Sequence, residues 1–387
     1  MRGHRITLLT LWADEQERDS IGNIEPLVEQ TIAVNLPRWR SLWNCLAAVP
    51  TLKPLQTVFC WEPALAHQLN ALIQPANGAL AFDVVHVEHL RGAEYGLYLK
   101  EQLASQGRSL PVVWDSVDSI SLLFRQAMVR SKSMLSREVA RFELGRTERY
   151  ESRLLKQFEH VLVTSPSDRR ALLALLPGNE AAAPVTVVRN GVDLNYFQPD
   201  NSVEREPATL VISGKMSYHA NIAMVLNFTQ EIMPRVWERR PDARLAIVGK
   251  DPPRELKILA DHPNITVTGT VLHLPPYLQR ATLAVSPLAY GVGIQNKVLE
   301  AMACATPVVT SPQAVSALDV RSEQEVLIAE EPAAFASAII GLLADPQHGR
   351  QIGEAGRCYV EKYHNWASAA VQLEEVYAQA ERAGIIR

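Results

Sequence analysis

The stretch that decides the fold spans residues 283–310 and reads LAVSPLAYGVGIQNKVLEAMACATPVVT. An apolar strand, Leu283–Ser286, ends at a proline and is followed by a loop that contains Gly291 and Gly293. A run of good helix formers then begins at Asn296, which we expect to be the N-cap, and a second apolar strand completes the stretch. The pattern predicts a strand–glycine loop–helix–strand unit of an α/β fold.

The start of this predicted helix has the chemistry of a phosphate site. Free backbone N–H groups at a helix N-terminus, reached through glycines, bind anions. Lys297 adds a full positive charge in the first turn. Glu300 lies one turn further on, where a carboxylate can accept two hydrogen bonds from the vicinal diol of a ribose. A helical Glu or Lys is ordinarily a solvated surface residue, but the apolar neighbours of Glu300 favour a ligand role.

The same alternation of strands and helices runs through the C-terminal half. We expect helices over Asn221–Arg240 and Asn296–Cys304. The expected strands are Thr209–Ser213, Arg244–Gly249, Ile265–Thr268, Leu283–Ser286 and Pro307–Thr310. Strands that alternate with helices predict right-handed crossovers and a parallel, doubly wound sheet.

The N-terminal half alternates too, and the polar, proline-flanked residues 198–207 separate it from the C-terminal half as a linker. The expected N-terminal strands are Arg5–Trp12, Thr31–Asn35, Phe82–Val87, Pro111–Trp114, His160–Thr164 and Val185–Val188. The stretch from Trp366 to about Arg382 has the apolar stripe of an amphipathic helix.

The overall composition is that of an ordinary globular protein. The chain has 387 residues, which predicts two domains, with 47% hydrophobic and 21% charged residues. A net charge of −4 gives no case for nucleic-acid binding. The four cysteines lack the spacing of metal ligands or of a disulfide framework, no apolar run is long enough to span a bilayer, and the N-terminus does not read as a signal peptide. We therefore expect a cytoplasmic protein.

Residues 300–309 read EAMACATPVV. This run resembles the donor-sugar motif of the group 1 (retaining) glycosyltransferases, in which a Glu, seven residues and a second Glu precede Ala-Met-Ala-Cys-Gly-x-Pro-Val-Val. Glu300 corresponds to the second acid, whereas Val292 stands in place of the first and Ala305 in place of the usual Gly. The pattern Gly-x-Gly-x-Gln-x-Lys-x-Leu-Glu is similar to a branch associated with exopolysaccharides and surface glycans. Further similarities at residues 83–87, 190–193 and 197–199 extend the resemblance over most of the chain.

The resemblance implies a GT-B fold, with two Rossmann-like domains facing each other across a cleft. Residues 1–198 would form the acceptor-side domain, completed by residues 366–387 as the C-terminal helix crosses back, and residues 208–365 the donor domain. The implied reaction moves a sugar, with retention, from a nucleotide-diphosphate sugar to a glycan or lipid-linked acceptor. The nucleotide-sugar is the donor substrate, and neither a metal nor another cofactor is implied.

The family pattern assigns donor-site roles residue by residue. The expected catalytic residues are Lys215, Lys297 and Glu300. Lys215 is included because its position directly after a glycine resembles that of a pyrophosphate-binding Arg in the family. We expect Asn221 only to cap a helix. The expected donor-binding residues are Gly214, Thr270, Val271, Gly291, Gly293, Ile294, Gln295 and Asn296.

Acceptor-site candidates follow two strands of the N-terminal domain. Asp115 and Asp118 end one strand, with helix capping by Asp118 or Ser119 as the alternative role, and Glu88 follows another. We expect His86, inside the strand before Glu88, to be packed in the core.

Nine bases and four acids recur between Arg125 and Lys156. Interleaved charges predict first a salt-bridged helix surface and second a cationic face for peripheral contact with anionic lipid at the inner membrane face.

One further expectation concerns the N-terminus. The first 80 residues contain only Gly3, Gly22 and Gly78, none of them after an apolar strand. The family opens with a strand, a glycine-rich loop and a helix, so we expect that this first unit is missing from the chain. Together with Val292, this keeps open a non-catalytic nucleotide-sugar-binding or scaffold protein and an incomplete fragment. A nucleotide-sugar 2-epimerase-like isomerase, which shares the fold, is a further alternative.

Overall fold

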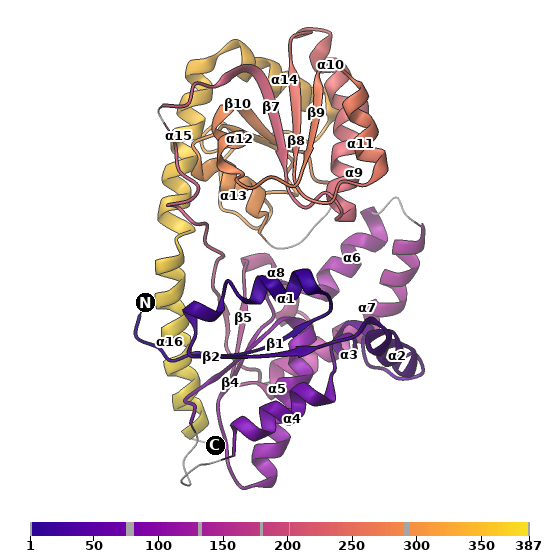
Figure 1. The fold of residues 1–387 in the computed structure, drawn as a ribbon, viewed down its shortest axis with the longest axis vertical. Helices are drawn as coiled ribbons and strands as arrows, with labels where there is room; N and C mark the ends of the chain where they lie inside the picture. Colours follow the sequence, from indigo (N-terminus) through magenta and orange to yellow (C-terminus); the bar gives the residue numbers. More distant parts are fainter. Residues whose placement is uncertain are drawn as a thin grey trace.

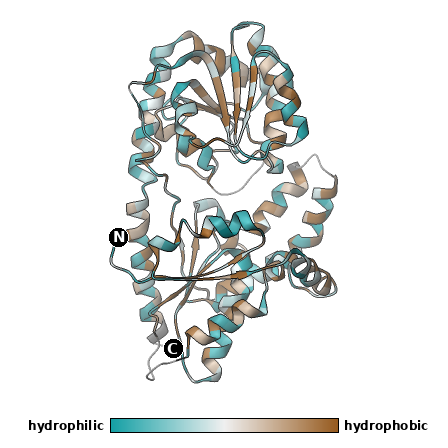
Figure 2. Ribbon diagram, viewed as in Figure 1, coloured by the Kyte–Doolittle hydropathy of each residue, from teal (hydrophilic) through white to brown (hydrophobic). Residues whose placement is uncertain are grey.

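The computed structural model describes residues 2–74, 81–130, 134–178, 181–200, 202–289 and 294–385. Two α/β domains are stacked along the long axis of the molecule, and the chain passes between them twice (Figure 1). The strands of both domains are largely hydrophobic, as expected for sheets buried between layers of helices (Figure 2).

The C-terminal domain is built on a six-stranded parallel sheet in the order β12-β11-β10-β7-β8-β9. Its strands are β7 (Glu206–Ser213), β8 (Arg244–Val248), β9 (Ile265–Gly269), β10 (Ala281–Ser286), β11 (Val308–Thr310) and β12 (Leu327–Ile328). The chain builds outward from β7 through β8 and β9, then returns to the other side of β7 with β10. The strand order therefore reverses between β7 and β10, where open α/β sheets bind ligands.

Helices cover both faces of this sheet (Figure 1). They are α9 (His219–Asn227), α10 (Met233–Trp237), α11 (Arg254–Lys257), α12 (Pro275–Arg280), α13 (Asn296–Ala303), α14 (Pro332–Ala344) and α15 (Pro346–Tyr363). The prediction of one helix over Asn221–Arg240 is wrong in detail, because a π-helical turn, Phe228–Ile232, joins α9 to α10. Pro234 has no N–H with which to continue the regular α-helical ladder at this point.

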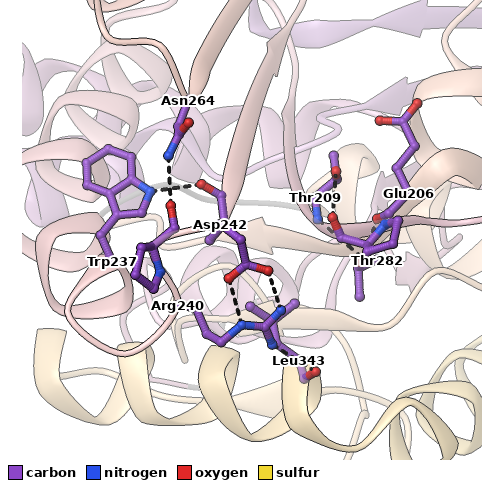
Figure 3. Close-up of polar contacts among 11 residues, drawn as sticks. Glu206, Thr209, Trp237, Arg240, Asp242, Asn264, Thr282 and Leu343 are labelled. Carbon is purple, nitrogen blue, oxygen red and sulfur yellow. Dashed lines mark hydrogen bonds and ion pairs between the residues drawn. The ribbon is translucent and has the colours of Figure 1, made fainter.

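Polar contacts close the amino-terminal edge of the C-terminal sheet (Figure 3). Arg240 pairs with Asp242 at 2.7 Å and donates to the Leu343 carbonyl at 3.1 Å. The Thr282 hydroxyl donates to the Glu206 carbonyl at 2.7 Å. These groups are satisfied within the domain, so this edge is structural and the carboxyl-terminal edge is the one open to function.

The N-terminal domain contains two separate parallel sheets. The four-stranded sheet has the order β3-β4-β5-β6, and β1 and β2 pair only with each other. Among the described residues, no strand pairs with the second edge of β1 or of β3. The expected absence of a first strand–loop–helix unit remains a prediction. The strands are β1 (Thr7–Trp12), β2 (Gln30–Asn35), β3 (Val85–Glu88), β4 (Val112–Asp115), β5 (His160–Val163) and β6 (Val185–Val187).

A long helical hairpin, α6–α7, projects from the N-terminal domain (Figure 1). The helices of this domain are α1 (Glu15–Ile21), α2 (Arg38–Ala48), α3 (Leu55–Phe59), α4 (Pro63–Leu72), α5 (His89–Ser105), α6 (Ile120–Arg130), α7 (Met134–Gln157) and α8 (Pro166–Leu173). No helix in the described ranges is both long and apolar enough to cross a membrane.

The last helix, α16 (Trp366–Ile385), crosses back onto the N-terminal domain, as expected from the resemblance. Its Val376 and Ala380 are buried in one cluster with Val113 of β4 and Leu162 of β5.

The two crossings of the chain are tied to each other. The His364 ring nitrogen Nδ1 lies 2.8 Å from the Asn190 carbonyl oxygen. Gly191 lies so close to Trp366 that an added Cβ would be 2.6 Å from the indole. An ion pair between Arg189 and Asp319 also joins the two domains. These contacts define a compact hinge.

Candidate active site

Lys215 and Lys297 come from the two elements that flank the point where strand order reverses. Lys215 follows β7, and Lys297 lies in the first turn of α13, which follows β10. Because all strands of the sheet are parallel, their carboxyl ends share one edge. In Figure 1, α13 lies on the side of the C-terminal domain that faces α6 and α8 of the other domain.

Asn221 of α9 joins the two lysine segments. Its amide nitrogen donates to the Lys215 carbonyl at 2.9 Å, and its amide oxygen accepts from Lys297 Nζ at 2.9 Å. The side chain is buried, and Tyr218 rather than Asn221 is the N-cap of α9. The expectation that Asn221 only caps a helix is therefore wrong. The sequence offered one signal, because Asn221 is a polar residue in the otherwise apolar stretch 220–226.

Two glycines allow the loops after β7 and β8 to touch. Gly214 has a φ of +145°, and an added Cβ would lie 3.3 Å from Lys297 Cε. A Cβ on Gly249 would lie 1.7 Å from the Gly214 carbonyl oxygen. Only glycine fits at Gly249, so this backbone contact fixes the position of the Lys215 loop.

Burial dominates the electrostatics of the α13 residues. Burial lowers the pKa of Lys297 to about 8, an effect that the nearby charge of Glu300 partly offsets. Burial likewise raises the pKa of Glu300, which Lys297 partly offsets. No ion pair joins these two side chains, both of which lie in the described part of the chain. Lys297 is instead held by neutral oxygens, those of Asn221 and, at 3.3 Å, of Gln295.

The structure corrects one detail of the α13 N-terminus. Gln295, not Asn296, is the N-cap, and its side chain makes no capping hydrogen bond because its oxygen lies toward Lys297 Nζ. Asn296 is the first helical residue and is exposed. Ile294 packs against the core of the domain. Gly291 and Gly293, like Val292, lie outside the described residues.

Thr270 and Val271 follow β9 at the same edge of the sheet, two strands away from Lys215. Gly269, at the end of β9, turns the chain with a φ of +69°. Thr270 is exposed, whereas Val271 is partly buried against the domain core.

The acceptor candidates Glu88 and Asp115 are direct neighbours in the register of β3 and β4. His86 Nε2 lies 3.6 Å from an Asp115 carboxylate oxygen, and His86 Nδ1 lies 3.0 Å from the Tyr377 hydroxyl. The prediction that His86 is a core residue is wrong: strand alternation turns it away from the buried Val87, and it is exposed. Burial raises the pKa of Asp115, and His86 opposes that shift.

Asp118 lies at the end of a strained turn. Val117 has a φ of +63°, which is rare for a β-branched residue and is found most often near functional sites. Burial and, secondarily, the charge of Asp168 raise the pKa of Asp118 to about 7. The capping role belongs to Ser119, whose hydroxyl accepts from the Leu122 N–H at 3.3 Å. Asp118 is therefore not the helix cap, and it remains a candidate for the site that binds the sugar acceptor.

Two buried carboxylates beneath this turn were not predicted from the sequence. Asp168 of α8 accepts from the Ser119 N–H at 3.0 Å, and Glu151 of α7 accepts from the Ile120 N–H at 2.8 Å. Both side chains are fully buried, and burial raises the pKa of Glu151 to about 7. These contacts anchor the base of the α6–α7 hairpin to the carboxyl end of the four-stranded sheet. Their sequence separation left no local signal.

The hairpin carries the basic stretch 125–156. Arg125 pairs with Glu148 at 2.7 Å and Arg141 with Glu138 at 3.1 Å, so the predicted salt-bridged surface is present. In the described part of the chain, no group of His, Cys, Asp or Glu side chains is arranged to hold a metal ion.

Comparison with known families and proteins identifies the class. Residues 207–345 match the family "Glycosyl transferases group 1", and residues 1–191 match "Glycosyl transferase 4-like domain". The glycogen synthase of Mycobacterium tuberculosis is 27% identical over 244 residues, 60% of this chain and 57% of that relative. The alpha-maltose-1-phosphate synthase of Mycolicibacterium smegmatis is 40% identical over 110 residues, 26% of this chain and 28% of that relative. The aligned region thus spans little more than half of the first relative.

Solved structures match over nearly the whole chain. The sucrose-phosphate synthase of Thermosynechococcus elongatus has a TM-score of 0.65 at 18% identity, covering 98% of this chain and all of that one. The Anabaena protein HepE, solved with UDP and glucose, has a TM-score of 0.65 at 13% identity, covering 97% of this chain and all of that one. The fold is therefore GT-B, as expected. The C-terminal half of the chain matches the group 1 glycosyltransferases and the N-terminal half a glycosyltransferase 4-like domain, so both halves resemble transferases.

Proposed function

We propose that the protein is a retaining glycosyltransferase that moves a sugar from a nucleotide-diphosphate sugar to a glycan or lipid-linked acceptor in surface polysaccharide or glycoconjugate synthesis. The observation that carries this proposal is the environment of Lys297. The partly buried ammonium group of Lys297 lies at a helix N-terminus beside the Lys215 loop, and its hydrogen-bond partners among the described residues are neutral oxygens.

A bound diphosphate would complete this environment. Burial of a cation costs free energy, which the lowered pKa of Lys297 reflects, and the nearby charge of Glu300 offsets this cost only in part. A lysine in the first helical turn also opposes the helix dipole. Both costs fall when an anion binds between Lys297 and the free N–H groups of α13. The site is thus built for a ligand with concentrated negative charge.

The same residues would act on the transition state. As the bond from the sugar to the nucleotide breaks, negative charge develops on the departing diphosphate. Lys215, Lys297 and the start of α13 would interact with the diphosphate more strongly in the transition state than in the ground state. This difference lowers the activation barrier. Glu300, one turn along α13, binds the ribose hydroxyls, and the loop at Thr270 and Val271 holds the base.

The acceptor would enter from the N-terminal domain, residues 1–198 together with 366–387, where Glu88 and Asp115 end parallel strands and Asp118 follows β4. In the retaining reaction it attacks from the leaving-group side, and the diphosphate helps to remove its proton. No side chain is assigned as general base. Movement about the hinge at Gly191 and His364 would close this domain over the donor held by residues 208–365.

The test compares nucleotide binding by the wild type and by Glu300→Gln, measured by calorimetry. The matched control is Glu354→Gln, at an exposed position of α15. UDP and UDP-glucose come first, because HepE was solved with UDP and with UDP-glucose, followed by the GDP, ADP and TDP series. Loss of hydrogen bonds to a charged group costs about 1.5–3 kcal/mol, so Glu300→Gln should weaken nucleotide binding about tenfold or more. It should also raise the thermal midpoint of the free protein, because it removes a partly buried carboxylate whose pKa is raised.

Unchanged nucleotide binding in Glu300→Gln, or no binding of any nucleotide to the wild type, would overturn the donor-site assignment. Turnover then separates the remaining alternatives. A 2-epimerase-like isomerase would convert the nucleotide-sugar without an acceptor. A scaffold protein would bind it and convert nothing.

A further inference from the structure

Helix α2 turns an apolar face toward solvent. Trp39, Leu42, Trp43 and Leu46 recur at the spacing of one helix face, and their exposed fractions are 63%, 63%, 64% and 65%. With Arg40 they line a shallow hollow on the surface. A surface helix normally packs such a stripe against the core. In the part of the chain that the structure describes, nothing covers it.

This apolar face continues onto helix α7. Arg146 of α7 donates to the Val49 carbonyl at 2.8 Å, and its guanidinium lies 4.0 Å from the centre of the Phe142 ring. The end of α2 therefore adjoins the middle of α7, and Figure 2 shows hydrophobic segments on both helices. We define the α2–α7 face by its exposed apolar residues: Trp39, Leu42, Trp43, Leu46, Val49, Leu52, Leu135, Val139 and Phe142.

The two helices that carry this face are basic. They contain eight Arg or Lys residues against four Glu, a formal charge of +4 in a chain whose net charge is −4. Two of the four acids, Glu143 and Glu151, are buried, which leaves the surface more cationic still. The bases are Arg38, Arg40, Arg137, Arg141, Arg146, Arg149, Arg153 and Lys156.

We infer that the α2–α7 face docks on the surface of an anionic lipid bilayer. Tryptophan side chains favour the boundary between headgroups and hydrocarbon, with leucines reaching deeper. A helix with an apolar face and basic neighbours lies in the plane of that boundary. The α7 bases would contact lipid phosphates while the α2 side chains insert. This extends to α2 the lipid contact expected from residues 125–156, and it does not depend on the donor site.

Charge argues against a second copy of this chain as the occupant. A twofold dimer would place the same patch on both sides of its interface. The basic helices α2 and α7 of both copies would then meet, and like charges across an interface disfavour association. Anionic headgroups instead complement the bases.

The test is co-sedimentation of the full chain with vesicles of phosphatidylcholine, with and without phosphatidylglycerol. Trp43→Gln/Leu46→Gln removes part of the apolar face, and Arg137→Gln/Arg141→Gln removes two exposed bases. Ile258→Gln, a half-exposed apolar residue of the C-terminal domain, is the matched control. Thermal midpoints verify that each variant is folded, which is expected because all these side chains point into solvent.

We expect the wild type and Ile258→Gln to sediment with phosphatidylglycerol vesicles. Trp43→Gln/Leu46→Gln should lower partitioning about tenfold or more. Arg137→Gln/Arg141→Gln should lower it about fivefold per base, and only on anionic vesicles. Absence of wild-type sedimentation, or equal sedimentation of the Trp43/Leu46 variant, would overturn the inference. A concentration-dependent dimer that the same variant abolishes would assign the face to a second copy instead.

Discussion

At the scale of single residues, Lys297 is the most informative side chain. Its partners are two amide oxygens, which orient the ammonium group without neutralising it. An ion pair at the same place would compete with the diphosphate for the charge. Neutral partners leave the full charge available to a ligand, at a cost that is visible as the lowered pKa of Lys297.

We predict that affinity for a nucleoside diphosphate falls above pH 8. Because the pKa of Lys297 is about 8 in the folded protein, binding at higher pH must first take up a proton, so affinity should fall by up to about tenfold per pH unit. Calorimetry across pH 7–10 measures this. Lys297→Met should bind weakly at every pH and lose the slope. The exposed Lys257→Met is the control and should retain it.

The same shift fixes the sign for stability. Between pH 8 and 10.5 Lys297 is more protonated in the unfolded chain than in the folded one, so its own contribution to the free energy of unfolding rises with pH in this window, and the stability of the wild type relative to Lys297→Met should rise accordingly. Below pH 8 both states carry the proton and Lys297 contributes no slope. Equal pH dependence of the free energy of unfolding in the wild type and in Lys297→Met between pH 8 and 10.5 would contradict the assignment.

At residue level, local spacing predicted part of the site. The placement of Lys297 in the first turn of a glycine-preceded helix followed from strand–loop–helix spacing. The bridge through Asn221 did not, because it depends on α9 and α13 lying side by side although the two residues are far apart in sequence. The prediction that Asn296 is the N-cap was wrong. Residue preferences for the N-cap position are averages over many helices, and in this chain Gln295 is the last residue of the loop. His86 faces solvent beside Asp115, which its apolar neighbours concealed.

At the scale of elements, the contact between the loops after β7 and β8 sets the position of Lys215. The Gly214 N–H donates to the Val248 carbonyl at 3.1 Å, and the Met216 N–H donates to the Lys250 carbonyl at 2.9 Å. Gly249 makes this approach possible, since it places no side chain between the loops.

We predict that Gly249→Ala destabilises the protein by about 3 kcal/mol or more, because its Cβ would meet backbone at 1.7 Å and the φ of +154° is unfavourable for alanine. Donor affinity should fall as well. Gly341→Ala is the control: its Cβ would meet nothing within 4 Å on α14, and it should stabilise by about 0.5–1 kcal/mol. Chemical denaturation measures both changes. Equal effects would refute the close-contact argument.

The alternation of the sequence predicted most strands of both domains to within a few residues. The boundary errors have physical causes. β12 has only two residues and therefore no periodicity to detect. The π-helical turn before Pro234 interrupts an otherwise helical pattern. The lone pairing of β1 with β2 is a matter of sheet order, which composition does not encode.

At the scale of the whole molecule, the hinge connects two domains with different proposed roles. One domain carries the proposed donor residues and the other carries the acceptor candidates. Lys215, Lys297 and Glu300 all lie in the C-terminal domain, whereas Asp118 lies in the N-terminal domain. Binding of the donor and transfer of the sugar should therefore be separable by changes at the hinge.

We predict that Gly191→Ala lowers turnover far more than donor affinity. Its Cβ would lie 2.6 Å from the Trp366 ring and 2.8 Å from the Trp366 backbone nitrogen, so the start of α16 must shift. Steady-state rates and nucleotide calorimetry on the same preparation separate the two effects. Gly349→Ala is the matched control, because its Cβ would make only an ordinary contact at 3.7 Å with Pro307. Parallel losses of affinity and turnover would show that the hinge does not separate the two functions.

The return of α16 to the N-terminal domain has a consequence for biosynthesis. Val113 and Leu162 are buried together with Val376 and Ala380, so this apolar cluster on the first domain's sheet stays incomplete until the ribosome has translated the whole second domain. At about 5–20 residues per second, that delay between β6 and α16 is on the order of 10 to 40 s. During this interval the nascent chain exposes apolar surface of the kind that chaperones recognise. A ribosome that stalls within residues 206–365 would release an aggregation-prone domain that lacks its last helix.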